Sequence, residues 1–478
     1  MTSTWFLRAA CMAVLLLGAG CATAPARSWQ THAFEFPFVH DYGVVNRTSF
    51  AWRDDFLSAD SRAYSQRLAG PLSALAASVY GYGLDMDVRA LTELGFNAPS
   101  LYRRYGRDID YGDAAYGRDQ VGFTLAAKRV VLDGAERDVL FVVVRGTYGR
   151  EEWLSNMNAC NTSGRRPDFD AARVPALHEG FSRAADAVQA AVEAYAASNG
   201  VANATAKVVV TGHSRGAAVA NLLGARLDDG ALLPGVRPEN VFVYAFAPPN
   251  TVLDRGIDCA APRYRNIFNV VNPEDMVPLV PITRWDARRY GTDLLLKHYD
   301  ELSVWEVWTD PAYNAMKDEF RRMTGYEWWH TPFGTNSTHL VPSVLGAVAP
   351  TIPDLYLVTK DQRAAGNDTS VHSVLEMMIF RSMDSVEDTP SPSLGGDVRQ
   401  LTGVYSKMGG EEPDASGAGR FFLPDGHDFS RQPGMLDLAW RMSCMHATQT
   451  YIGWMKAAER YGPAAVYLNW PSTENKER

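Results

Sequence analysis

A serine between two glycines is the feature of this chain that points most directly to chemistry. It lies in Gly212-His213-Ser214-Arg215-Gly216, after an apolar run at residues 207–211 and before a helix-forming run at residues 217–227. A strand, a G-x-S-x-G turn and a helix in this order are typical of a nucleophile elbow, which lifts the serine hydroxyl above a sheet. The glycines let strand and helix approach closely. We predict that Ser214 is the nucleophile of an acyl-transfer reaction.

Such a serine needs an imidazole to take its proton and a carboxylate to orient that imidazole. Asp275 follows an apolar run at residues 266–271, where the acid of this type of site belongs, and the order Ser, Asp, His along the chain is the one expected. Asp275 is therefore the predicted acid. The neighbouring Glu274 is the alternative.

Several histidines follow Asp275 and could serve as the base. His446 stands just ahead of a final amphipathic segment that contains Tyr451, Trp454 and Met455. Folds with a nucleophile elbow normally present their histidine at such a place near the end of the chain. We predict His446 as the base. His427 is the alternative base, and the remaining candidates are His298, His330, His339 and His372.

The negative oxygen that forms during acyl transfer needs hydrogen-bond donors. One is expected to be the backbone N–H of Arg215, next after the nucleophile, and the other to come from a loop after an earlier strand. Residues 144–147 supply such a loop.

Successive motifs of the middle third resemble the class 3 lipase family. They are Arg145-Gly146-Thr147 with Trp153 downstream, His178-Glu179-Gly180-Phe181, GHSRGAAVANLL from Gly212, Tyr244 to Pro248, and Asn272 to Pro278. The resemblance covers about residues 120–282. It implies that Thr147 is the oxyanion-hole residue, that Asp275 is the acid, and that His178 and His213 have packing and hydrogen-bonding roles. It also implies lipid substrates, either acylglycerols or phospholipids.

The surrounding pattern predicts an α/β-hydrolase fold, with a mostly parallel sheet and helices on both faces. The expected elements are a hairpin of residues 129–132 and 139–144 around Asp133-Gly134, a helix at residues 180–198, and buried strands at residues 207–211, 241–246 and 266–271. The core is expected at about 120–282. A large helical insertion is expected at about 284–433 and a closing helix at about 434–461.

The insertion is rich in aromatic side chains. Tyr313, Met316, Phe320 and Met323 have helical spacing, and the tryptophans of this region include Trp305, Trp308, Trp328 and Trp329. These tryptophans either line an acyl pocket or a membrane-facing lid, or they belong to the core, as large aromatic side chains commonly do.

The first residues predict export. Arg8, an apolar run at residues 9–17 and small residues after it form the pattern of a signal peptide at residues 1–20, too short to span a bilayer as a mature helix. Cys21 lies where a bacterial lipoprotein is lipidated, whereas Ala22-Thr23-Ala24 offers an ordinary cleavage site. A tether is expected at residues 21–35 and the hydrolase domain at residues 36–470. We expect an exported protein held at a membrane surface by lipidated Cys21, or a secreted one.

Composition limits the partners. The chain has 478 residues, 46% of them hydrophobic, and a net charge of −9 without a basic cluster, which argues against nucleic acid. Beyond the leader it has Cys160, Cys259 and Cys444, whose spacing suits neither a metal site nor a redox motif. One disulfide, Cys160 with Cys259, or three buried thiols are the two expectations. We expect no metal and no cofactor, and the sequence leaves the oligomeric state open.

These features together predict a serine carboxylic-ester hydrolase of the lipase or esterase type. Smaller carboxylic esters are an alternative substrate class, because the acyl pocket falls in the part of the chain outside the resemblance. An acyltransferase with the same three residues is an alternative activity. A non-catalytic surface lipoprotein that uses the fold for binding is an alternative of another class.

Overall fold

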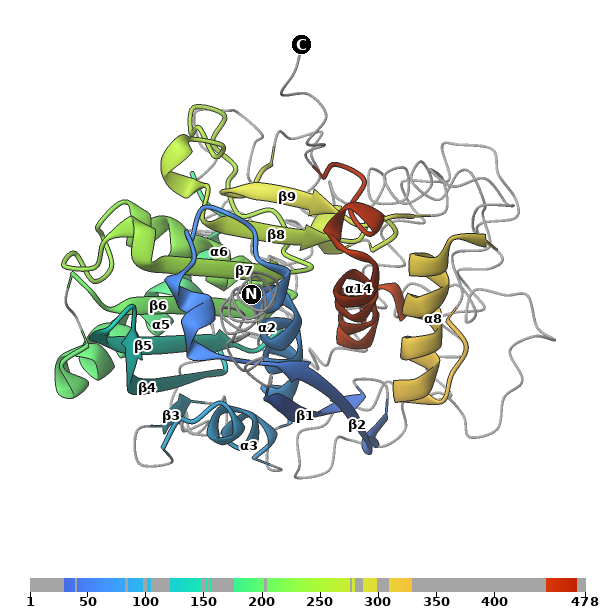
Figure 1. The fold of residues 1–478 in the computed structure, drawn as a ribbon. Helices are drawn as coiled ribbons and strands as arrows, with labels where there is room; N and C mark the ends of the chain where they lie inside the picture. The colour runs from blue at the N-terminus through green and yellow to red at the C-terminus, as the bar shows by residue number, and fades with distance from the viewer. Residues whose placement is uncertain are drawn as a thin grey trace, which may run out of the picture.

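The computed structural model describes residues 30–38, 41–81, 85–97, 101–104, 121–147, 152, 155–156, 176–201, 204–275, 277–279, 287–298, 309–328 and 444–470. A seven-stranded sheet runs through the middle of this part of the chain, in the order β3-β4-β5-β6-β7-β8-β9 (Figure 1). Its strands are β3 (Leu101–Arg104), β4 (Phe123–Leu132), β5 (Ala135–Val144), β6 (Lys207–His213), β7 (Val241–Phe246), β8 (Ile267–Val271) and β9 (Thr292–Leu295). The pairs from β5 to β9 are parallel, and β3, β4 and β5 are antiparallel.

The sheet is covered by helices on both faces, and the side chains of β5 show how. Alternate residues of a strand point to opposite faces. Phe141 and Val143 accordingly join one core cluster, with α2 (Gln66–Ser78), and Val142 and Val144 join the other, with α5 (Glu179–Asn199) and α6 (Arg215–Asp228). Parallel strands buried on both faces, alternating with helices, make this the α/β-hydrolase fold that the sequence predicts.

The predicted elements of the core are present. The hairpin turns at Asp133 and Gly134, both with positive φ, as a two-residue turn requires. The expected helix at 180–198 is α5, and the expected strands are β6, β7 and β8. Their ends differ from the expectation by at most two residues, except that β4 begins six residues before the expected Arg129 and β5 begins four residues before the expected Val139.

The amino-terminal part of the domain begins earlier than expected. Strand β1 (Thr31–Phe38) pairs antiparallel with β2 (Asp41–Ala51), so the last residues of the tether predicted at 21–35 belong to a strand. Phe34, Phe36 and Phe38 of β1 are fully buried. Helices α2 and α3 (Met86–Glu93) pack against this hairpin.

The predicted insertion begins too early. Strand β9 falls within residues 284–433, yet it extends the central sheet beside β8. In the same interval α8 (Pro311–Thr324) buries Tyr313, Met316, Phe320 and Met323, the four residues with helical spacing, and Trp328 is also core. Residues 301–308 and 329–443 lie outside the described residues, with Trp305, Trp308, Trp329, His330, His339, His372 and His427.

The closing helix expected at about 434–461 is α14 (Thr448–Tyr461), which ends at the expected residue and begins later than expected; residues 434–443 lie outside the described residues. Helix α14 lies between α8 and α2 (Figure 1). Its Gln449 is fully buried and donates hydrogen bonds to Pro37 O at 2.9 Å and Asn46 Oδ1 at 2.8 Å, both in the amino-terminal hairpin. The end of the described chain is thereby attached to its beginning. The short 3₁₀ helices are Asp54–Ser58, Pro238–Asn240, Pro262–Tyr264, Val277–Leu279 and Pro463–Ala465.

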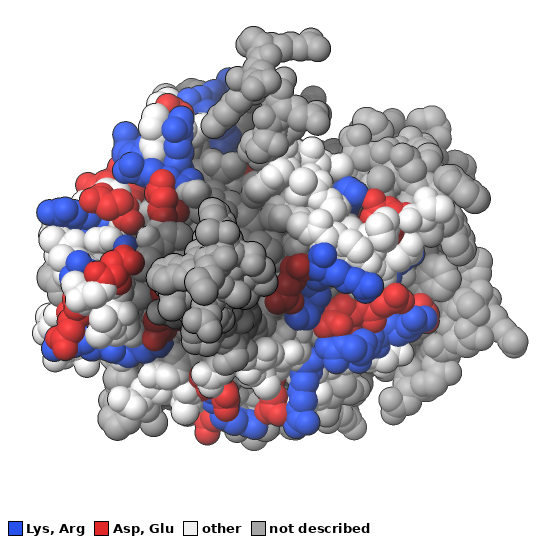
Figure 2. Space-filling model, viewed as in Figure 1, with Lys and Arg blue, Asp and Glu red and all other residues white. Residues whose placement is uncertain are grey.

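Acidic and basic side chains alternate on the surface. Figure 2 shows red and blue patches side by side over α8 and α14, where Arg322 pairs with Glu319 and Lys456 with Glu459. Searched over the described residues, no helix combines the length and the apolar character needed to cross a bilayer.

Candidate active site

Ser214 lies at the sharp turn between β6 and α6. Its φ of 59° and ψ of −129° place it in a region that non-glycine residues rarely adopt, and its N–H donates to Phe246 O on β7 at 2.9 Å. Strained backbone of this kind is kept only where the surroundings hold it. The turn is thus held by the neighbouring strand, with the serine at the start of the helix.

Two glycines allow this turn to sit against the sheet. A Cβ at Gly216 would lie 2.2 Å from Val144 O, and one at Gly212 would lie 2.5 Å from the carbonyl of Gly216. Both distances are far below contact. The glycines of the motif are therefore required by the close approach of α6 to β5, as the sequence predicts.

The structure brings Ser214, His446 and Asp275 together. Ser214 Oγ is 2.9 Å from His446 Nε2, and His446 Nδ1 is 2.7 Å from Asp275 Oδ2. The imidazole is 25% exposed, whereas the Asp275 side chain is fully buried. A hydroxyl that can donate to an imidazole, itself oriented by a buried carboxylate, is an arrangement suited to nucleophilic catalysis.

Asp275 is held by more than the histidine. Its Oδ1 accepts from Val277 N–H at 2.9 Å, and its Oδ2 also accepts from the Tyr451 hydroxyl at 2.8 Å. Burial, followed by the negative charge of Asp275, raises the pKa of Tyr451 well above its usual value, so this hydroxyl stays protonated as a donor. Glu274 is buried next to Asp275, but the carboxylate bonded to His446 belongs to Asp275.

The backbone on either side of the imidazole is fixed by strand-end residues. Asn272 Nδ2 donates to Met445 O at 3.2 Å, and His213 Nε2 lies 2.8 Å from His446 O. Tyr80 Oη is 3.0 Å from His213 Nδ1. Burial, followed by the proximity of His446, lowers the pKa of His213 well below its usual value, so His213 is neutral. A neutral His213 that donates from Nε2 must accept at Nδ1, from the tyrosine.

The predicted oxyanion loop passes beside this turn. Thr147 is half-buried on the loop after β5, and a Cβ at Gly146 would lie 2.8 Å from His213 O. Arg215 is the first residue of α6, so its N–H points along the helix axis toward the serine end. The two predicted donors therefore come from adjacent segments.

Arg145 and His178, two residues of the sequence motifs, make buried contacts beside this loop. Arg145 donates to Glu152 at 2.9 Å within an ion pair whose side chains are 1% and 2% exposed. His178 accepts from Phe181 N–H with Nδ1, and its Nε2 lies 3.2 Å from Asn156 O. Burial, followed by the charge of Arg215, lowers the pKa of His178 to about 3. His178 and His213 thus have the hydrogen-bonding roles expected of them.

The remaining sequence predictions have different outcomes. His298 is buried on the segment after β9, and His427 lies outside the described residues. Cys259 is a buried free thiol whose pKa burial raises to about 11, so the expected disulfide with Cys160 is wrong. Cys444 is also a buried thiol, and Cys160 is not among the described residues. No cluster of potential metal ligands occurs in the described part of the chain.

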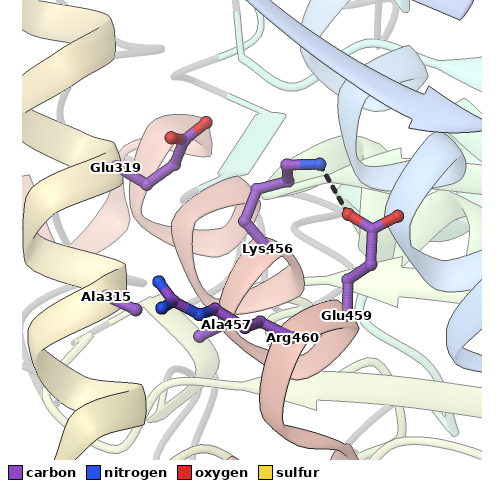
Figure 3. A pocket seen from close by; sticks show the side chains of 6 residues that line it. All are labelled: Ala315, Glu319, Lys456, Ala457, Glu459 and Arg460. Atoms are coloured by element: carbon purple, nitrogen blue, oxygen red, sulfur yellow. Dashed lines mark hydrogen bonds and ion pairs between the residues drawn. The ribbon is translucent and has the colours of Figure 1, made fainter. Parts of the chain in front are cut away.

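A pocket elsewhere on the surface is separate from this site. It has a volume of about 280 Å³, lies between α8 and α14, and is lined by Ala315, Glu319, Lys456, Ala457, Glu459 and Arg460 (Figure 3). None of Ser214, His446 and Asp275 contributes to it. Within the pocket wall Lys456 forms an ion pair with Glu459 (Figure 3), and Glu319 pairs with Arg322 beside the pocket.

Comparison with known proteins finds lipases. Residues 141–285 match the model of the class 3 lipase family. Secreted mono- and diacylglycerol lipase 1 of Fusarium solani is 29% identical over 153 residues, which are 32% of this chain and 42% of that protein. The matched part therefore spans less than half of this curated relative.

Solved structures of similar proteins include the Rhizomucor miehei lipase propeptide complex and lipase II from Rhizopus niveus. The first is 19% identical, covers 49% of this chain and 70% of that chain, and has a TM-score of 0.32. The second is 17% identical, covers 49% and 81%, and has a TM-score of 0.32. The family match contains Ser214 and Asp275 and ends before His446.

Proposed function

We propose that the protein hydrolyses carboxylic esters of lipids by a two-step acyl transfer, with Ser214 as nucleophile, His446 as base and Asp275 as the acid that orients the base. The observation that carries the proposal is the hydrogen-bonded series from Ser214 Oγ through His446 to Asp275. His446 and Asp275 are more than 170 positions apart in the sequence. The class 3 lipase match over residues 141–285 supports it.

In the first step His446 Nε2 takes the proton of Ser214 as Oγ attacks the ester carbonyl. The tetrahedral anion is stabilised by the N–H groups of Arg215 and Thr147, which come from the helix start and the adjacent loop. His446 then gives its proton to the departing alcohol. An acyl-enzyme on Ser214 results.

In the second step His446 takes a proton from a water molecule as its oxygen attacks the acyl carbon. The bond from the acyl carbon to Ser214 Oγ then breaks, and His446 returns the proton to Oγ as the carboxylic acid leaves. Asp275 accepts a hydrogen bond from the imidazole and stabilises the imidazolium that forms in each step, without taking the proton itself. Its three hydrogen bonds, from His446, Tyr451 and Val277, keep the carboxylate in one orientation.

Acylglycerols are the substrates we propose, in view of the relative described as a mono- and diacylglycerol lipase. Phospholipids and smaller carboxylic esters are the other ester classes to compare. We further propose that the protein is exported and held at a membrane by lipidated Cys21. The pattern of residues 1–21 and the secreted relative support export.

The decisive experiment compares the wild type with Ser214→Ala. Purified wild type is expected to be labelled by a fluorophosphonate probe and to hydrolyse monoacyl-, diacyl- and phosphoglycerides at different rates. The variant should lose both labelling and turnover while its unfolding temperature stays nearly unchanged. Turnover retained by Ser214→Ala would refute the assignment.

Adding a primary alcohol to the same assay separates a hydrolase from an acyltransferase. A hydrolase releases mainly free acid, whereas an acyltransferase forms mainly the new ester. A wild type that is folded but neither labelled nor active would instead be a binding protein.

A further inference from the structure

An arginine just ahead of the last strand of the sheet joins two loops of the candidate site. Arg289 precedes β9, and its side chain is 8% exposed. Its Nη1 donates to Pro248 O, in the loop after β7, and to Pro278 O at 2.9 Å, in the loop after Asp275. One nitrogen atom thus binds the backbone of two segments that are far apart in the sequence.

The first of these carbonyls follows the strand end that holds Ser214. Phe246 O, at the end of β7, accepts from Ser214 N–H at 2.9 Å. The next residue, Ala247, has a φ of 55°, a conformation that a residue other than glycine keeps only where its surroundings impose it. Those surroundings include the Arg289 guanidinium, which binds the carbonyl of Pro248 directly after it. The contact therefore secures the end of β7 next to Ser214.

The second carbonyl belongs to the loop that carries the proposed acid. Val277 N–H donates to Asp275 Oδ1 at 2.9 Å, and Pro278 is the next residue of the same short 3₁₀ helix. A shift of this turn would move Val277 N–H as well and would rotate the carboxylate relative to His446. The contact from Arg289 therefore fixes where the acid loop lies against the end of β7.

The guanidinium is itself fixed to the sheet. Its Nε and Nη2 donate to Asp293 Oδ1 and Oδ2, each at 2.9 Å, in a bidentate ion pair. Asn269 Nδ2 on β8 donates to the same Oδ1 at 3.0 Å, and Asn269 Oδ1 accepts from Asn221 on α6 at 3.0 Å. A planar guanidinium has N–H groups for a carboxylate and for both carbonyls at once, whereas the ammonium group of lysine is a point charge on a flexible stem. These contacts therefore require arginine and not merely a positive charge.

We propose that Arg289 is a positioning residue for the acid of the proposed site. It binds the acid loop to the end of β7, so that Asp275 faces His446 while Ser214 is held at the neighbouring strand end. The proposal rests on the acyl-transfer function proposed above. A residue that only stabilised the fold would leave the turnover of the folded enzyme unchanged.

The first test removes the guanidinium with and without loss of the charge. Arg289→Met keeps the aliphatic stem, and Arg289→Lys keeps the positive charge as well. Each is expected to lower kcat on a soluble short-chain ester by on the order of 100-fold, because a displacement of about 1 Å in the reacting geometry can cost that much. KM should stay within about threefold, because the contacts of Arg289 orient the acid and leave ground-state binding of the ester unchanged.

A second test asks whether Arg289 acts through Asp275. Asp275→Asn already removes the acid, so adding Arg289→Met to it should lower kcat further by less than about threefold. The hydrogen bond between His446 and Asp275 gives an independent signal. Its proton is expected to resonate far downfield in the NMR spectrum of the wild type, and this resonance should shift in Arg289→Met and Arg289→Lys.

Arg288→Met is the matched control. Arg288 is the neighbouring residue, and its Nη2 donates to Arg255 O at 2.8 Å and Asp254 O at 3.4 Å, in a loop that contributes none of the residues of the proposed site. This variant should keep kcat within about threefold of the wild type and leave the downfield resonance in place.

Unfolding temperatures of all variants define the range in which kinetics and spectra are compared. Unchanged kcat in folded Arg289→Met or Arg289→Lys would overturn the inference, as would effects of Arg289→Met and Asp275→Asn that multiply. A wild type without fluorophosphonate labelling or turnover would instead refute the proposed function itself.

Discussion

Replacing Asp275 tests most directly whether Asp275 or its alternative, Glu274, is the acid of the proposed site. Asp275→Asn keeps the shape but allows the amide to hold the imidazole in the wrong tautomer, so kcat should fall by on the order of 10⁴. Glu274→Gln should change kcat by less than about tenfold. Steady-state kinetics on a soluble ester checks both, and the reverse ranking would make Glu274 the acid.

The Tyr451 hydroxyl bonds to that carboxylate and is fully buried. Tyr451→Phe removes a hydrogen bond to a charged group and should lower the free energy of unfolding by about 1.5–3 kcal/mol. Because His446 and Val277 still hold Asp275, kcat should fall by less than about tenfold. Urea unfolding and kinetics measure the two effects; an unchanged stability would show that the bond contributes nothing.

The three residues of the proposed site, which the structure joins by hydrogen bonds, could be selected from the sequence, whereas most of their supporting partners could not. Ser214, Asp275 and His446 stand at recognisable places: an elbow, a strand end, and the start of a final helix. Asn156, Asn272 and Tyr80 are single polar residues without a motif of their own. Their contacts form between segments far apart in sequence, so only the folded arrangement shows them.

At the scale of elements, the close approach of α6 to β5 holds Ser214, the proposed nucleophile, at its turn. Gly216→Ala would place a Cβ 2.2 Å from the backbone oxygen of Val144, whereas Gly224→Ala on the same helix meets mainly the Val243 side chain at 2.8 Å. A backbone atom can move away from an added Cβ less easily than the end of a side chain can. Gly216→Ala should therefore cost more stability, about 3 kcal/mol or more against about 1 kcal/mol, since overpacking in cores costs about 1–3 kcal/mol.

Activity should follow the same order, because a shifted helix start moves Ser214 away from His446. Thermal unfolding and turnover of the two alanine variants are to be compared side by side. Equal losses in both would mean that the contact between the helix start and β5 is not what fixes the elbow.

The core elements were predictable because they follow simple periods. The parallel strands β6, β7 and β8 contain short apolar runs and are buried over nearly their whole length, as strands covered on both faces must be, and α5 has apolar residues at three- and four-residue spacing. The amino-terminal hairpin and β9 were not recognised. Strand β9 is only four residues long and only partly buried, so it lacks the apolar run that marks the inner strands.

At the scale of the whole molecule, stability should depend on pH through buried groups with shifted pKa values. The pKa of His178 is about 3 in the folded protein, against about 6.5 when unfolded, and that of His213 is lowered as well. Between pH 6.5 and 3 the unfolded chain therefore binds more protons. The contribution of these histidines is complete above pH 6.5 and is lost on acidification, by at most about 1.4 kcal/mol per pH unit for each.

Asp228 acts in the opposite direction. Burial raises its pKa from 3.8 to about 7, so its contribution to stability is complete below pH 3.8 and is lost as the pH rises to 7. Asp228→Asn removes this opposing dependence. As the pH falls from 6.5 to 4, the free energy of unfolding should decrease more steeply in the variant than in the wild type. Relative to the wild type, the variant should be more stable at pH 8 than at pH 4.

Urea unfolding at pH 8, 6, 5 and 4 tests this, with Asp186→Asn on the exposed face of α5 as the control. Curves of wild type and Asp228→Asn that run parallel over this range would contradict the assignment of the titration to Asp228.

The attachment of the last helix to the first hairpin also bears on when the protein becomes active. Ser214 and Asp275 are synthesised well before His446, and the helix that follows His446 needs the Pro37 carbonyl and Asn46 to satisfy Gln449. A ribosome-bound chain that has only reached residue 400 contains the proposed nucleophile and lacks the proposed base. A chain that ends before His446 is therefore expected to lack the proposed esterase activity.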